Sequence, residues 1–143
     1  MAGNSRLRVD RTEPFLAFVF FRKDSRRAGE ALLTELRAKG RMTEKEMSQF
    51  VKRLAAGDLG FRFSKTNFYK GILGRYLDLG FVKKGTIHGG EKGKTVNAYL
   101  PVLQPIPAHA PDSPSFWSVA YQICLWWNDI MFPEDRPTEQ EQS

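Results

Sequence analysis

The feature that most constrains the fold is a predicted helix that starts at Ser64 and stops at Gly80. The Ser64 hydroxyl can accept a hydrogen bond from the free amides of a first helical turn. Gly80 can adopt the left-handed conformation with which many helices end. Between these limits, large apolar side chains recur at intervals of three and four residues, which places them on one core-facing side. They are Tyr69, Ile72, Leu73 and Tyr76.

The opposite side of this helix carries small and polar residues flanked by cations. Each glycine inside a helix costs about 1 kcal/mol relative to alanine. We interpret the two glycines on this side as a sign that the surface lies close to something flat. The residues of this side are Asn67, Lys70, Gly71, Gly74, Arg75 and Asp78.

After Gly80 the pattern changes to two predicted strands joined by a basic, glycine-rich loop. The first strand begins at Phe81 and Val82, and the second contains residues 96–100 with apolar side chains at alternate positions. The loop between them reads HGGEKGK, a composition typical of a turn between strands.

Two further helices are predicted upstream. The first is capped by Asp24 or Ser25 and ends at Gly40. The second begins with a capping box, in which Thr43 and Glu46 satisfy each other's free amides. The side chains expected to face the core are Ala28, Ala31, Leu32, Leu36, Met47, Phe50, Val51 and Leu54.

The stretch from Arg75 to Val82 reads RYLDLGFV, which is similar to the leucine–acidic–glycine–leucine–valine ending common in winged helix-turn-helix domains. A helix with this ending, followed at once by a basic hairpin, resembles the second half of such a domain. The resemblance implies a mainly α fold with a small β-hairpin (α+β), built as a three-helix core plus a wing. It also implies that the helix after Ser64 enters the major groove and that the wing reaches a neighbouring backbone or minor groove.

Basic charge is densest on the predicted helix and hairpin. The chain has a formal net charge of +6, and residues 62–94, with eight basic and two acidic side chains, carry a net +6 by themselves. The excess of basic residues before this segment cancels the excess of acidic residues after it. This distribution is typical of a nucleic-acid-binding face, although an incidentally basic, solvated surface remains an alternative.

Specific side chains suit contacts with duplex DNA. Asn67 can pair with adenine and Lys70 can reach the acceptors of guanine, while residues of the first turn suit phosphates. Other basic residues would hold the backbone on either side or act from the wing. The expected DNA contacts are Arg62, Ser64, Lys65, Thr66, Asn67, Lys70, Gly71, Arg75, Lys83, Lys84, Lys92 and Lys94.

A proline-rich linker over residues 104–114 marks the end of the predicted winged helix domain, residues 14–103. An apolar helix follows over residues 115–132. It is short for a membrane span and is interrupted by polar residues, so we expect no membrane association. It packs either on its own domain or on a second copy. We favour a homodimer because tryptophan and tyrosine are enriched in interface cores. The expected interface residues are Phe116, Trp117, Tyr121, Ile123, Trp126, Trp127 and Ile130.

The remaining segments carry less information. Residues 1–13 are expected to form a disordered basic arm and residues 133–143 a disordered acidic tail. The apolar run 15–21 is compatible with either a strand or the start of a helix. The single cysteine, Cys124, lies in an apolar run and is expected to be a buried thiol, which fits a reducing intracellular compartment.

No pattern predicts an enzyme, a metal site or a cofactor. His88 and His109 lie far apart in the sequence, without the spacing of a zinc site. The sequence therefore predicts a non-enzymatic, cytoplasmic and nucleoid-associated dimer that binds double-stranded DNA, as a transcription regulator or an architectural or partition factor. Two alternatives stay open. One is a protein-interaction module that docks through its tryptophan-rich helix. The other is binding of RNA or single strands by the aromatic residues near Phe61 and Phe63 together with the basic loop.

Overall fold

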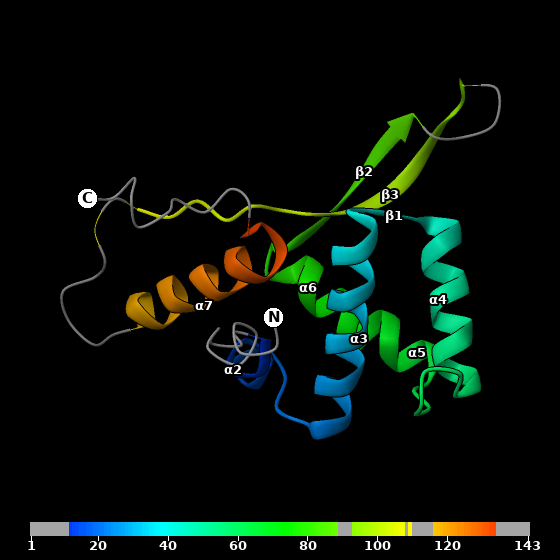
Figure 1. The fold of residues 1–143 in the computed structure, drawn as a ribbon, viewed down its shortest axis with the longest axis horizontal. Helices are drawn as coiled ribbons and strands as arrows, with labels where there is room; N and C mark the ends of the chain where they lie inside the picture. The colour runs from blue at the N-terminus through cyan, green and yellow to red at the C-terminus, as the bar shows by residue number, and fades with distance from the viewer. Residues whose placement is uncertain (1–11, 89–92, 108, 110–115, 134–143) are drawn as a thin grey trace, which may run out of the picture.

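The structure, a computed structural model, describes residues 12–88, 93–107, 109 and 116–133. Over these ranges the chain is mostly helical with a three-stranded antiparallel sheet, which confirms the expected α+β class. In Figure 1, α3, α4 and the run α5–η1–α6 lie below the sheet, and α2 and α7 lie to one side. The elements are α2 (Thr12–Val19), α3 (Lys23–Lys39), β1 (Met42–Thr43), α4 (Glu44–Ala56), α5 (Lys65–Asn67), η1 (Phe68–Leu73), α6 (Gly74–Asp78), β2 (Val82–His88), β3 (Thr95–Pro101) and α7 (Phe116–Met131).

Several predictions fall partly or wholly outside the described residues. These are most of the basic arm (1–11), the tip of the hairpin loop (89–92, which includes Lys92), much of the proline-rich linker (108 and 110–114), the first residue of the predicted apolar helix (115) and most of the acidic tail (134–143).

The apolar run near the N-terminus forms a helix, α2. The sequence had left a strand and a helix open as alternatives for this run. Phe15, Leu16 and Val19 are buried along one side of α2 at the spacing of a helix. The helix begins at Thr12, two residues before the expected start of the folded domain.

Helix α3 ends at Gly40 as predicted, but its beginning was predicted wrongly. The residue at the N-cap is Arg22, which makes no capping hydrogen bond through its side chain, and α3 starts at Lys23. The guanidinium of Arg26 donates instead to the carbonyl oxygens of Phe20 and Phe21, at 2.9 and 3.1 Å. A cation in the first turn of α3 thus satisfies the backbone carbonyls that follow the end of α2. The pattern of short polar caps does not predict this contact.

Helix α4 begins with the predicted capping box. The Thr43 hydroxyl accepts from the Glu46 amide at 3.1 Å, and the Glu46 carboxylate accepts from the Thr43 amide at 2.9 Å. The Thr43 amide holds the pKa of Glu46 below its ordinary value of 4.5. The capping box therefore fixes the point at which β1 ends and α4 begins.

The sheet contains the predicted hairpin and one strand that the sequence did not reveal. Strands β2 and β3 pair antiparallel, with Val82 opposite Pro101 and His88 opposite Thr95. Strand β1 pairs with the other edge of β3, so the order is β1–β3–β2. Because β1 contains two residues, it shows no alternation that a sequence pattern can detect. It ties the α3–α4 connection to the base of the hairpin.

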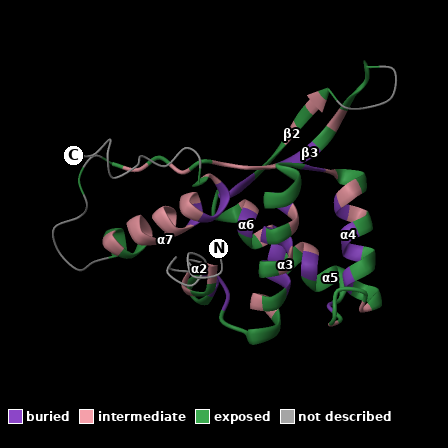
Figure 2. Cartoon of the chain, viewed as in Figure 1, coloured by how far each residue is buried: buried purple, intermediate pink, exposed green. Residues whose placement is uncertain are grey.

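Helix α7 packs on the same chain through its C-terminal half. Trp127 is fully buried, and its ring centroid lies 4.9 Å from that of Phe81, 5.6 Å from Phe15 and 5.9 Å from Tyr76. Figure 2 shows the buried residues gathered where the helices face one another, whereas the N-terminal end of α7 is exposed. Among the helices of the described ranges, none has the length and apolar character needed to cross a membrane.

A hydrogen-bonded strap joins α7 to the base of the hairpin. The backbone amide of Gln104 donates to the side-chain carbonyl oxygen of Asn128 at 2.9 Å, and the side-chain amide of Asn128 donates to the backbone carbonyl of Gln104 at 2.9 Å. The Trp127 indole donates to the Val102 carbonyl at 2.8 Å, and the Val102 amide donates to the Phe81 carbonyl at 2.8 Å. The first residue of the expected linker is therefore part of the packed fold.

The capping box generates a prediction about acid stability. The pKa of Glu46 is lower in the folded chain, so its carboxylate gives full stabilisation above pH 4.5 and loses it as the pH falls below that value. Glu46→Gln keeps only a neutral hydrogen bond. The difference in Tm between wild type and this variant should therefore shrink between neutral pH and about pH 3 in thermal unfolding.

The control is Glu30→Gln, which removes a carboxylate that accepts no hydrogen bond among the described residues. A Tm difference for Glu46→Gln that stays constant over the same pH range would contradict the assigned role of the carboxylate.

Candidate nucleic-acid interface

The helix predicted from Ser64 to Gly80 has the expected ends. The Ser64 hydroxyl accepts from the Asn67 amide at 3.2 Å. At the other end, Gly80 has a φ of 81°, the left-handed conformation that the prediction required. The Phe81 amide donates to the Tyr76 carbonyl at 3.0 Å and the Gly80 amide to the Leu77 carbonyl at 3.1 Å. This pair of bonds closes the last turn.

The middle of this helix is not an ordinary α-helix. Over η1 the chain forms a π-helical turn, in which the Gly74 amide donates to the Tyr69 carbonyl five residues earlier. The extra residue rotates everything that follows by about 100° around the axis, because each residue of an α-helix occupies that angle.

The π turn overturns one detail of the sequence prediction. A uniform period of 3.6 residues placed Tyr69 in the core and Phe68 on the flank. In the structure Phe68 is fully buried and packs on Phe50, whereas Tyr69 is only partly buried. Ile72, Leu73 and Tyr76 are buried as predicted. A wider turn brings Phe68 onto the same side as Leu73, which a constant helical period cannot anticipate.

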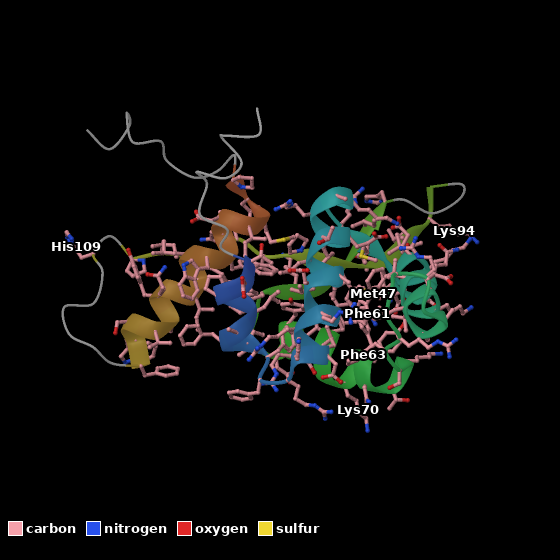
Figure 3. The ribbon with its side chains drawn as sticks, turned by 60° about the horizontal axis from the view of Figure 1, so that its bottom comes forward. Met47, Phe61, Phe63, Lys70, Lys94 and His109 are labelled. Carbon is pink, nitrogen blue, oxygen red and sulfur yellow. The ribbon has the colours of Figure 1, made fainter. Side chains whose placement is uncertain are left out.

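The exposed side of the run carries cations without partners. Lys65, Lys70 and Arg75 are exposed, one on each of the three segments of the run, and none forms an ion pair among the described residues. Asn67 and Thr66 are exposed beside them. In Figure 3, Lys70 points away from the body of the molecule at its lower edge.

Several cations elsewhere in the described chain are neutralised by acidic neighbours. Lys39 lies 3.4 Å from Glu35 and 3.3 Å from Glu46, and Arg53 lies 3.5 Å from Glu35. The Lys39–Glu46 and Arg53–Glu35 pairs link α3 to α4, whereas Lys39 and Glu35 both belong to α3. Lys65, Lys70 and Arg75 of the helical run form no such pair among the described residues.

Lys84 belongs to the paired group, although the sequence placed it among the DNA contacts. Its ammonium lies 2.9 Å from the carboxylate of Glu44, which also accepts from the Asn97 amide group at 3.1 Å. The Lys84 hydrogen bond lowers the pKa of Glu44, and the Glu44 hydrogen bond raises the pKa of Lys84. Because β1 brings the start of α4 beside the hairpin, Lys84 braces the sheet against α4.

The other predicted contacts lie apart from the helical run. Lys83 is exposed on β2 and Lys94 is exposed next to β3. Figure 3 shows Lys94 pointing outward from the hairpin, at a different edge of the molecule from Lys70. Arg62 is exposed before the helical run, with its side chain alongside Gly57. The structure thus presents two separate groups of exposed basic residues, here called the two basic places: Lys65, Lys70 and Arg75 on the helical run, and Lys83 and Lys94 on the hairpin.

The aromatic residues before Ser64 do not form an open stacking platform. Phe63 has an exposed fraction of 9%. Phe61 is partly buried, and the guanidinium of Arg27 lies 4.3 Å from its ring centroid. This arrangement does not favour the single-strand alternative, which requires exposed rings.

The expected interface residues of α7 divide into two groups. Trp127 and Ile130 are buried within their own chain, so for these residues packing in cis replaces the expected contact between subunits. Tyr121, Ile123 and Trp126 are partly exposed. Phe116 and Trp117 have exposed fractions of 74% and 71%, and Val119 of 41%.

No group of three or more histidine, cysteine, aspartate or glutamate side chains among the described residues is placed to hold a metal ion. His109 lies at the opposite end of the molecule from the hairpin in Figure 3. Cys124 is half-buried rather than fully buried, and this burial raises the pKa of its thiol.

Comparison of the chain with protein-family models, with curated proteins and with solved structures finds no match.

The π turn makes a prediction about Gly74. A Cβ atom at this position would lie 2.9 Å from the Tyr69 carbonyl oxygen, closer than real contacts allow. Replacing a helical glycine with alanine ordinarily stabilises by about 0.5–1 kcal/mol. Gly74→Ala should instead destabilise by about 1–3 kcal/mol, through overpacking against the backbone. Thermal unfolding measured by circular dichroism checks the sign, and a raised Tm would show that the turn accepts a side chain here.

Proposed function

We propose that this chain is a winged helix-turn-helix protein that binds double-stranded DNA. The order of elements supports the proposal. Helix α3, the short strand β1, helix α4, the run α5–η1–α6 and the hairpin β2–β3 follow the layout of three helices and a wing. A small strand between the first two helices that joins the outer edge of the hairpin is compatible with the same layout.

The observation that carries the proposal is the row of exposed cations along the helical run. Lys65, Lys70 and Arg75 are exposed, form no ion pair among the described residues, and follow one another along the run with no acidic residue between them. Other exposed cations, such as Arg37 and Lys52, also lack an ion pair there, whereas Lys39, Arg53 and Lys84 each face a carboxylate of Glu35, Glu44 or Glu46. A cation that already faces a carboxylate gains less from a phosphate. The unpaired row on a helix suits a polyanion that carries closely spaced charges.

The two basic places suit two contact points on one duplex. In this proposal the helical run lies in the major groove, where Asn67 and Lys70 face base edges and Lys65 and Arg75 face phosphates. The hairpin, with Lys83 and Lys94, reaches a neighbouring stretch of backbone. Lys84 is left out because Glu44 holds it.

We further propose that a second copy of the chain covers the exposed half of α7. Figure 1 shows the N-terminal end of α7 extending away from the rest of the molecule. Phe116, Trp117 and Val119 are exposed there, and α7 carries no charged side chain before Asp129. A two-fold interface places the same patch on both sides, which an uncharged apolar surface tolerates without repulsion. Such a dimer would present two helical runs to DNA, as suits a nucleoid-associated regulator or an architectural or partition factor.

The DNA-binding proposal is tested by titrating the protein onto a labelled random duplex at several salt concentrations. Six exposed cations are available: Arg62, Lys65, Lys70, Arg75, Lys83 and Lys94. If each neutralises one phosphate, the logarithm of the affinity should fall with the logarithm of salt with a slope of about −5 per chain. Lys70→Glu should weaken binding, with little change in Tm because its side chain has no partner among the described residues.

The matched control is Arg37→Glu, which makes the same change in charge beside a shallow hollow shared by α3 and α7. It should weaken binding much less than Lys70→Glu. The proposal is wrong if the wild type does not bind at low salt, or if the two variants bind equally well. The first result would favour a protein-docking module that uses α7.

The dimer is tested by analytical ultracentrifugation of Trp117→Ser, with Leu79→Ser as the control. Leu79 has an exposed fraction of 50%, follows directly after α6 and is not one of the residues assigned to the proposed interface. Trp117→Ser should shift the mass from dimer to monomer, because a large buried aromatic ring dominates such an interface. Leu79→Ser should leave the dimer intact. A wild type that stays monomeric throughout the concentration range would contradict the dimer.

A further inference from the structure

The two glycines of the helical run, Gly71 and Gly74, differ in whether the fold itself requires a glycine at that position. Gly74 is explained within the chain, because the Tyr69 carbonyl leaves no room for a Cβ atom. Gly71 is not explained in this way. A Cβ atom built there meets nothing within 4 Å among the described residues, and Gly71 does not have the positive φ that favours glycine.

A glycine without a conformational or steric reason weakens its helix. Gly71 lies inside η1, where alanine would restrict the unfolded chain and improve helix formation. Its presence therefore points to a requirement outside the chain. Glycine allows a ligand to approach the backbone itself, since no side chain stands between them.

The surroundings of Gly71 indicate what approaches. Lys70 precedes it, Asn67 lies one turn earlier on the exposed side, and both side chains extend into solvent. Lys70 and Arg75 form no ion pair with any other described residue, and no acidic side chain lies between Lys65 and Arg75 in the sequence. The backbone at Gly71 carries no side chain, whereas the side chains around it are long and bear a cation or an amide. This arrangement fits an anionic surface that contacts the backbone at its centre and the side chains at its edges.

We propose that duplex DNA contacts the backbone of Gly71 directly and that the missing side chain sets the depth at which the helical run enters the groove. This inference rests on the proposed DNA-binding function. A methyl group at residue 71 would hold the duplex away from the helix. It would also move the ends of Asn67 and Lys70 away from the groups they contact.

The test uses the full chain with Gly71→Ala and Gly71→Leu, and with Ala38→Leu as the control. Ala38 is exposed near the C-terminal end of α3, which Figure 1 places beside β1 and away from α5. Thermal unfolding and binding to a labelled random duplex are measured on each protein. Gly71→Ala should raise the Tm by a few degrees, about the effect of removing one helical glycine.

In the same proteins, Gly71→Ala should weaken DNA binding by about tenfold and Gly71→Leu by more. Ala38→Leu should leave binding unchanged. A variant that gains stability and loses affinity cannot owe the loss to unfolding, which makes the paired measurement decisive.

Three results would overturn the inference. If the wild type binds DNA and Gly71→Ala binds equally well, the duplex does not touch residue 71, although the proposed function stands. If Gly71→Ala lowers the Tm, the glycine serves the fold. If the wild type binds no DNA at any salt concentration, the proposed function fails first and the inference fails with it.

Discussion

The packing of Trp127 is the interaction on which the rest of the structure depends. Its ring touches aromatic side chains of α2, of α6 and of the residue that opens the hairpin, and its indole N–H is satisfied by the Val102 carbonyl. Elements from both ends of the described chain therefore share one aromatic cluster. The hydroxyl of Tyr76, in the same cluster, donates to the Gly29 carbonyl at 3.0 Å and fixes the helical run against α3. A buried polar atom with a partner costs little, so the cluster is both apolar and satisfied.

Local signals in the sequence predicted local structure well. The capping box at Thr43, the Ser64 cap and the left-handed Gly80 each depend on a few neighbouring residues, and each is confirmed. The features that the sequence did not reveal depend on residues far apart in the sequence or on unusual geometry. The partner of Lys84 is Glu44, forty residues away, and strand β1 exists only because β3 is beside it. The burial of Phe68 follows from a π turn that no propensity scale encodes.

The candidate site shows the same division. Composition alone indicated a basic segment, but it could not separate cations that brace the fold from cations that are available to a ligand. Lys84 and Lys70 look alike in the sequence, and only their surroundings distinguish them. Likewise, Gly71 and Gly74 are equivalent helical glycines in the sequence. Only the structure shows that the Tyr69 carbonyl leaves no room for a side chain at Gly74. The sequence gives the charge and size of a side chain, and tertiary contacts decide whether that side chain is already bound within the fold.

The strap between Gln104 and Asn128 has a consequence for how the molecule responds to ions. It consists of neutral amide groups that hydrogen-bond to each other, next to a buried indole, and it contains no charged side chain. Screening by salt weakens contacts between separated charges and has little effect on neutral hydrogen bonds. Helix α7 should therefore stay docked over a range of ionic strength in which exposed lysines lose their hold on an anion. Under the proposed function, a rise in ionic strength would therefore release the DNA from the basic surface without loosening the fold that carries this surface.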